Sequence, residues 1–397
     1  MMVWTAKILF LLFPVGVVMG RWALDGTLSL IALLFLIHSV KEKDFSWIKS
    51  KWVMAFFALW LWMVIRTLFA DNPEFGIGRA LVFVRYGIFT CALAFWLLPN
   101  RQDLLQKFLF ISLLCVLALS LDGLLQFFMG YDIMGKTPAG NRITGPYNAP
   151  ILGNMIYPLI TLGGFYAVER IDLKQTMIKN LFFITMPIFA VLMILISGDR
   201  SPLLLTGLAG CIGFIIANRT LKIKAGLVGL VILLVGSVVI FSNHDIQNRQ
   251  SQIIGKVTNF SSSDYGQVFE KGWQIAKANP LFGVGVKHYR LACEQHYAKD
   301  ECLTHPHNIY IEILAETGII GLSLLLTMIG FIFYALWCHR QDWRYDVLTL
   351  GGFCLICTEF WPLIGSSSFT SSWGVYGLWL GLGIIMSKLS KPILSKP

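Results

Sequence analysis

The sequence predicts an all-α polytopic membrane protein with about 12 transmembrane helices and one large outer loop that contains short helices. The 397 residues are 56% hydrophobic and only 14% charged, whereas soluble proteins carry about 25% charged residues. Apolar stretches close to the length that crosses a bilayer core, about 20 residues, recur along the whole chain. Polar residues concentrate instead in one loop, which runs from about residue 242 to 306.

Twelve apolar stretches are predicted to span the membrane. They lie at about 3–20, 23–39, 52–70, 79–98, 104–129, 149–168, 181–197, 201–217, 223–241, 307–337, 347–364 and 373–388. The first stretch lacks a cleavage site of small residues and another span follows it at once, so we expect a retained helix rather than a signal peptide. The chain therefore divides into nine spans within 1–241, the loop 242–306 and three spans within 307–397.

The distribution of basic residues predicts the orientation. Loops and flanks on the side of the N-terminus carry 18 Lys and Arg, whereas the short loops on the other side carry five. Because basic residues are enriched on the cytoplasmic side of membrane proteins, both termini are expected in the cytoplasm and the 242–306 loop outside. The net charge of +10 then mostly reflects the basic residues that orient the protein in the membrane. We therefore expect no nucleic-acid partner.

Two of the eight cysteines, Cys293 and Cys302, lie in the outer loop, and the other six lie in or beside predicted spans. An oxidising compartment would allow the two loop cysteines to pair. The alternative is a pair of free thiols, and their spacing does not decide between the two.

A short amphipathic helix is expected in the loop at about 266–278. Apolar residues from Val268 to Ala276 recur at helical spacing, and Asp264 with Gln267 three residues later is expected to cap the helix. Gly283-Val284-Gly285 follows. These two glycines allow either a close approach to a ligand or a tight turn, and the sequence leaves both open.

The most informative run is Thr304-His305-Pro306-His307-Asn308, where the loop meets a span. We expect His307 in the first turn of that span, at its outer mouth, with Glu312 and Glu316 further along. An ionisable group at membrane depth is a functional candidate by default. The alternatives are solvated side chains, or a metal site at the two histidines, for which no Cys or Asp cluster completes the ligands.

At these residues the chain resembles the O-antigen ligase and polymerase family. The pattern His-Asn-x9-Gly-x-x-Gly, from His307 to Gly321, is typical of its ligase branch. The resemblance covers roughly residues 140–325. It includes the runs 141–148, 197–201 and 273–285.

The chain departs from the family pattern at one position. Members often carry an arginine several residues before the loop tryptophan, and here Gln267 stands near that place. If that arginine contacts pyrophosphate in relatives, another residue must serve here, such as Lys271 or Arg290.

The resemblance implies a metal-independent glycosyltransferase without cofactor. It would move a glycan from undecaprenyl pyrophosphate to lipid A–core at the periplasmic face of the bacterial inner membrane, in contact with membrane lipid. His307 is expected to accept the proton of the attacking hydroxyl. Arginines are expected to stabilise the departing pyrophosphate, because guanidinium offers a permanent charge and a planar fork of donors. The expected substrate-binding residues are Arg200, Arg142, His305, Asn308, Arg79 and Arg290.

Two other functions stay open. An O-antigen polymerase would join lipid-linked repeat units, and one sequence does not fix the acceptor. A transporter or flippase is compatible with twelve spans and with Arg66 and Arg85 inside them; burial cost argues that these two arginines face a cavity or a partner. The chain shows no symmetry between halves of the kind transporters often have. Substitution of charged residues at the membrane midplane should impair a transporter most, whereas substitution of His307 at the membrane surface should impair a transferase most.

Overall fold

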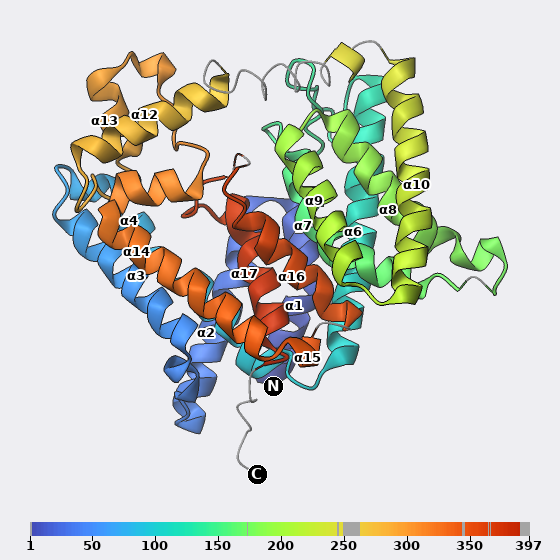
Figure 1. Ribbon diagram of the computed structural model, residues 1–397, viewed down its shortest axis with the longest axis horizontal. Helices are drawn as coiled ribbons and strands as arrows, with labels where there is room; N and C mark the ends of the chain where they lie inside the picture. Colours follow the sequence, from blue (N-terminus) through green and yellow to red (C-terminus); the bar gives the residue numbers. More distant parts are fainter. Residues whose placement is uncertain are drawn as a thin grey trace.

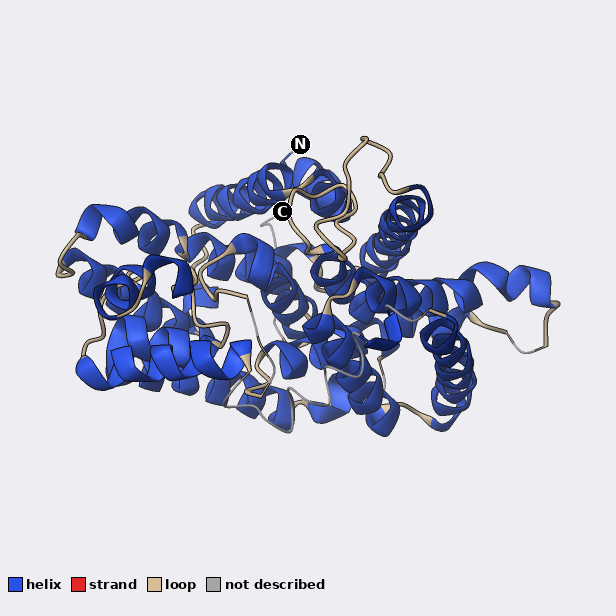
Figure 2. Cartoon of the chain, turned by 90° about the horizontal axis from the view of Figure 1, so that it is seen from above, coloured by secondary structure: helices blue, strands red, loops and turns tan. Residues whose placement is uncertain are grey.

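The computed structural model describes residues 2–172, 174–243, 246–248, 263–343, 346–363, 365 and 367–389. Residues 244–245 and 249–262 of the predicted outer loop, which include His244, lie outside the described residues. In Figure 2 the described chain consists of helices and loops, without a strand.

The helices follow the apolar stretches of the sequence. In chain order they are α1 (Met2–Met19), α2 (Arg21–Glu42), η1 (Ser46–Lys49), α3 (Lys51–Leu68), α4 (Pro73–Val82), α5 (Val84–Ala92), η2 (Leu93–Leu97), α6 (Gln102–Met129), α7 (Leu152–Arg170), α8 (Met177–Ser197), α9 (Arg200–Ile216), α10 (Arg219–Ser242), α12 (Asp264–Ala278), α13 (Tyr289–His296), η4 (Lys299–Glu301), α14 (Ile309–Cys338), α15 (Arg340–Trp343), α16 (Val347–Glu359) and α17 (Ser372–Met386).

Eight helices of the described chain are long and apolar enough to cross a membrane. They are α1, α2, α3, the stretch 73–97, α6, α8, α10 and α14. The apolar helices α9, α16 and α17 are shorter, and α7 belongs to neither group. The predicted all-helical class is confirmed and a helix stands at each of the twelve predicted positions, but the number of true spans stays a prediction.

The elements of the outer loop lie at one end of the helical body. In Figure 1, α12 and α13 lie at the top, and the N-terminal end of α1 lies at the bottom. Beneath the loop elements, α14 packs against α3 and against α12, while α16 packs against α17, α7 and α9. Polar loop residues are therefore gathered over a bundle of apolar helices. That this end faces the periplasm stays a prediction.

An aromatic cluster fills the centre of the bundle. Tyr86 on α5 stacks on Trp379 of α17 with ring centroids 6.1 Å apart, and Phe83 and Phe369 contact Trp379 at 5.8 and 5.9 Å. All four side chains are buried. Because Phe369 belongs to this cluster, the segment that leads into α17 is anchored to the core.

The expected amphipathic helix is present as α12, but its cap differs from the prediction. The hydroxyl of Ser263 accepts the N–H of Gly266 at 3.1 Å, so Ser263, and not Asp264, is the N-cap. Ser263 has extended backbone, as capping residues require, and Asp264 already belongs to the helix. The prediction was displaced by one residue.

Candidate active site

The start of α14 corrects the predicted position of His307. Asn308, with extended backbone, is the N-cap: its side-chain oxygen accepts the N–H groups of Tyr310 and Ile311 at 3.0 and 3.1 Å. His307 therefore precedes the helix instead of lying in its first turn, and its φ is +54°. Asparagine is among the preferred capping residues, and its side chain competes with the backbone inside helices. The imidazole of His307 lies against that of His305, with ring centroids 4.2 Å apart.

Two side chains at the start of α14 also form hydrogen bonds with the chain that directly follows α16. The side-chain amide of Asn308 donates to the carbonyl of Pro362 at 2.9 Å, and the hydroxyl of Tyr310 donates to the carbonyl of Phe360 at 2.7 Å. The expected substrate-binding residue Asn308 is thus buried and already bonded through both its oxygen and its nitrogen.

Glu312 holds the segment that leads into α17. Its buried carboxylate accepts the hydroxyl of Ser368 at 2.5 Å and the N–H of Phe369 at 2.9 Å. A buried carboxylate is costly unless hydrogen bonds satisfy it, so this contact defines the position of the segment. Glu312 is therefore bonded to the protein and does not stand alone at membrane depth.

Glu316, one helical turn after Glu312 on α14, lies beside the glycine-containing loop. Its buried carboxylate lies near the backbone N–H groups of Lys287 and Tyr289, with Oε2 unpaired in the described structure, and its backbone carbonyl accepts the N–H of Gly285 at 2.7 Å. Gly283 has φ +70°, and a Cβ there would lie 2.4 Å from the carbonyl carbon of Glu316. Both glycines adopt positive φ. The close approach that the glycines allow is therefore made to the backbone of α14.

This loop packs against α14 at the point where the helix is interrupted. Gly318 has non-helical dihedrals, φ +69° and ψ −171°. The N–H of Ile319 bonds to the carbonyl of Pro280 at 2.9 Å, and the indole of Trp62 on α3 donates to the carbonyl of Thr317 at 2.9 Å. These two hydrogen bonds give partners to backbone groups that lack their usual intrahelical partners where the helix is interrupted. Gly321, the last residue of the motif, lies beside the Trp62 ring.

Residues of α4, α13, the loop and the segment that leads into α17 line a cavity of about 260 Å³, here called the cationic cavity. Its basic lining residues are Arg79 of α4, Lys287 of the loop and Arg290 of α13, and His305 and Ser368 lie on its wall. The structure thus brings together three of the expected substrate-binding residues: Arg79, Arg290 and His305. Nothing in the sequence singled out Lys287.

The three cations differ in how they are held. Arg290 pairs with Glu294 at 2.8 Å, and the ammonium of Lys287 lies 4.2 Å from the ring centre of Phe75. The guanidinium of Arg79 makes no hydrogen bond or ion pair within the described chain, although its charge acts on the carboxyl groups of Glu312 and Glu316. Its donors therefore remain available to a ligand in the cavity.

A disulfide stabilises the chain that leads to His305. Cys293 of α13 is bonded to Cys302, which follows η4 directly. The expected pairing is confirmed in the structure. Lys271 pairs with Glu301 at 2.8 Å. Of the two replacements considered for the missing family arginine, it is therefore Arg290 that lines the cavity.

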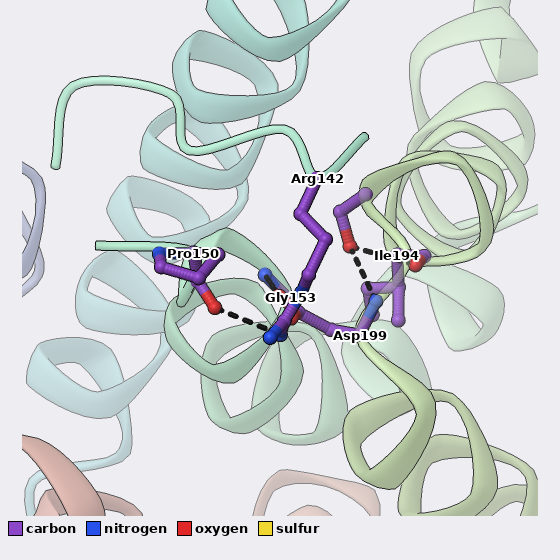
Figure 3. A network of polar contacts seen from close by, with 6 residues as sticks. Arg142, Pro150, Gly153, Ile194 and Asp199 are labelled. Atoms are coloured by element: carbon purple, nitrogen blue, oxygen red, sulfur yellow. Dashed lines mark hydrogen bonds and ion pairs between the residues drawn. The ribbon is translucent and has the colours of Figure 1, made fainter. Parts of the chain in front are cut away.

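Arg142 and Arg200 do not line the cationic cavity. Figure 3 shows Arg142 directed at Asp199, with which it forms an ion pair, and donating to the carbonyl of Pro150 at 3.0 Å. The Asp199 side chain is fully buried and accepts the N–H of Gly153 at 2.7 Å. Burial raises the pKa of the Asp199 carboxyl, and Arg142 opposes this shift. Asp199 was missed although it directly precedes Arg200 in a family-like run.

A second, smaller cavity of about 30 Å³, here called the side alcove, shares Ser367, Trp373 and Gly374 with the cationic cavity. Its other walls come from α7, α9 and the end of α16. Leu205 of α9 lines it, and Arg200 begins that helix five residues earlier. Arg200 thus belongs to the helix that borders the side alcove.

The two arginines inside predicted spans have partners, as the cost of burial requires. Arg85 pairs with Asp25 at 2.9 Å. The Nε of Arg66 donates to the carbonyls of Phe282 and Gly283 at 3.1 and 2.9 Å. Both arginines therefore have structural roles that need no transport pathway.

Part of the chain matches a known protein family. Residues 186–326 match the family model described as O-antigen ligase. A comparison with curated proteins gives no match. The matched segment contains α12, α13, the disulfide and the His307–Gly321 pattern, so the resemblance expected from the sequence is confirmed. Over residues 186–326, the chain is similar to the O-antigen ligase family.

Proposed function

We propose that the protein is an O-antigen ligase-type glycosyltransferase. It moves a glycan from undecaprenyl pyrophosphate to lipid A–core at the periplasmic face of the inner membrane. The observation that carries this proposal is the convergence of Arg79, Lys287 and Arg290 on one cavity beside His305 and His307. A pyrophosphate is the leaving group in this reaction, and a cavity lined by three cations is suited to hold its charge.

Arg79 makes the main contact with the leaving group. Its guanidinium has no hydrogen bond or ion pair in the described structure, so binding a phosphate does not break an existing contact. A planar guanidinium binds two phosphate oxygens at once. Lys287 on the loop and Arg290 on α13 add further positive charge. Glu316 and the disulfide hold these two elements in position.

His307 accepts the proton of the acceptor hydroxyl. As the hydroxyl oxygen bonds to the anomeric carbon, the bond from that carbon to the pyrophosphate oxygen breaks, and the proton passes to the imidazole. The positions support this role, because His307 contacts His305 and His305 lines the cationic cavity. The helix N-terminus that follows at Ile309 disfavours the protonated imidazole, although His307 lies just outside the helix.

Transfer by the purified protein tests this assignment. With undecaprenyl-pyrophosphate-linked glycan and lipid A–core in nanodiscs, His307→Ala should lower the rate by about 10²–10⁴-fold, the usual effect of losing a general base. His305→Ala should keep partial activity. His339→Ala, at the opposite end of α14, is the matched control and should transfer as wild type does.

Three results separate the alternatives. Near-full activity of His307→Ala with loss in His305→Ala would show that the wrong histidine is assigned. Full activity of both variants would place the chemistry elsewhere. If the wild-type protein lengthens the lipid-linked glycan without lipid A–core and does not transfer it to lipid A–core, the protein is a polymerase.

A further inference from the structure

The side alcove carries a pair of polar groups that the proposed reaction does not use. The indole Nε1 of Trp373 is buried and has no hydrogen-bond partner in the described structure. The carboxylate of Glu359, at the C-terminal end of α16, likewise makes no hydrogen bond or ion pair with the described residues. Both residues line the side alcove.

The two groups lie on neighbouring parts of the wall. A Cβ added at Gly377 would lie 3.1 Å from the Oε1 of Glu359, so this carboxylate rests against α17 one turn beyond Trp373. Tyr157 also lines the alcove, but its hydroxyl is already hydrogen-bonded to Thr358. An unpaired donor and an unpaired acceptor therefore face the same small space.

The chemistry of this pair selects one type of ligand group. Buried polar groups are nearly always hydrogen-bonded, and leaving them unpaired costs free energy. A hydroxyl can accept from the indole N–H and donate to the carboxylate at the same time. The volume of about 30 Å³ holds a hydroxyl or hydroxymethyl group and is too small for a sugar ring.

The position of the alcove relates this group to the substrate. It shares Ser367, Trp373 and Gly374 with the cationic cavity, so a molecule whose phosphates occupy that cavity can reach it. No Lys or Arg is among the residues that line the alcove in the described chain, and it carries the acidic Glu359. It is therefore unsuited to a phosphate and suited to the neutral, hydroxylated part of the same molecule.

We propose that the side alcove is a saccharide subsite. Trp373 and Glu359 bind a hydroxyl or hydroxymethyl group of the donor glycan while its pyrophosphate lies in the cationic cavity. The proposal rests on the proposed function, because that function places the pyrophosphate. It adds a specificity determinant, since the alcove distinguishes a sugar-bearing lipid from the bare polyprenyl pyrophosphate released by the reaction.

Binding of two probes to the full-length protein in detergent tests this subsite. The probes are undecaprenyl pyrophosphate and undecaprenyl pyrophosphate that carries one N-acetylglucosamine. Trp373→Phe removes the indole N–H with little change in shape, and Glu359→Met removes the acceptor oxygens with little change in side-chain size. Each variant should bind the sugar-bearing probe about five- to tenfold more weakly than wild type, the effect of one lost hydrogen bond, and should bind the bare probe unchanged.

The controls separate this proposal from the proposed function. Trp337→Phe, at an exposed tryptophan near the far end of α14, should bind both probes as wild type does, and Arg79→Ala should weaken both. Wild-type affinity of both alcove variants for the sugar-bearing probe would overturn the subsite, showing that the alcove holds only water. Equal weakening for both probes would also overturn it, because the alcove would then only support the cationic cavity. Failure of wild type to bind the bare probe would refute the pyrophosphate site itself, and the subsite with it.

Discussion

Replacement of Gly318 by alanine tests how the loop and α14 build the cavity. Gly318 has φ +69° and ψ −171°, a conformation open essentially only to glycine. An added Cβ would lie 2.1 Å from the carbonyl oxygen of Leu281 and 2.3 Å from its carbonyl carbon. These atoms belong to the backbone, so rotation of a side chain cannot relieve the contact.

The expected effect of Gly318→Ala has two parts. An alanine held in this backbone region costs about 1–3 kcal/mol, and overpacking adds about 1–3 kcal/mol unless the loop moves. Relief of the contact requires a shift of Leu281 by roughly 1 Å or more, because non-bonded carbon atoms separate to about 3.5 Å. Lys287 follows on the same loop, and Arg290 follows on α13. A displacement of about 1 Å at a reacting site lowers rates by about 10²-fold.

Gly330→Ala is the matched control. Gly330 lies on the same helix with ordinary dihedrals, and a Cβ there would meet nothing within 4 Å. Both variants should be purified in detergent and compared in glycan transfer and in thermal unfolding. Gly318→Ala should lose about 10²-fold in transfer and unfold at a lower temperature, whereas Gly330→Ala should match wild type. Equal behaviour of the two variants would refute the role given to the break.

Three further predictions concern other parts of the outer end. Cys302→Ser opens the disulfide and should destabilise the loop by about 2–3 kcal/mol on the entropic model; protease resistance of the loop, with and without reductant, measures this, and equal resistance would contradict it. Arg142→Ala leaves the buried carboxylate of Asp199 without its cation and should lower transfer and thermal stability more than Arg142→Lys; identical unfolding of the two variants would show that the ion pair is dispensable. A cysteine at Met134 should react with an impermeant reagent from outside intact spheroplasts and one at Ser46 should not; the reverse result would overturn the predicted orientation.

Hydropathy and spacing predicted the elements whose signals are local. Helices stand at the twelve predicted positions because apolar side chains recur there over the length of a span. The helix α12 could be predicted because its apolar spacing repeats within 15 residues. The pairing of Cys293 with Cys302 was one of two stated alternatives, between which the sequence did not decide.

The cap of α14 was available from sequence but was overlooked. Asn308 directly precedes the apolar run, and asparagine is a favoured N-cap; the preceding Pro306 was given more weight. As a result His307 was placed in the helix. Its left-handed backbone has no local signal in the sequence.

The cavity itself could not be predicted, because it depends on contacts between distant parts of the chain. Arg79 and Lys287 are separated by 208 positions yet line one space. The partner of Arg142 is Asp199, 57 residues later. Trp373 and Glu359 gave no signal, because a tryptophan and a glutamate at the ends of apolar helices are common at membrane interfaces. Only the packing of α16 against α17 brings them to the same alcove.

The cationic cavity is assembled across the boundary of the family-matched segment. Residues 186–326 supply Lys287, Arg290 and His305, but Arg79 precedes that segment and Trp373 follows it. A fragment limited to the matched residues would therefore carry the motif histidine and only part of the wall. Under the proposed function, substitutions on α4, α16 and α17 can change which glycan is accepted while the matched segment stays recognisable. Relatives with the same motif can then differ in substrate, and their specificity is best compared at positions 79, 359 and 373.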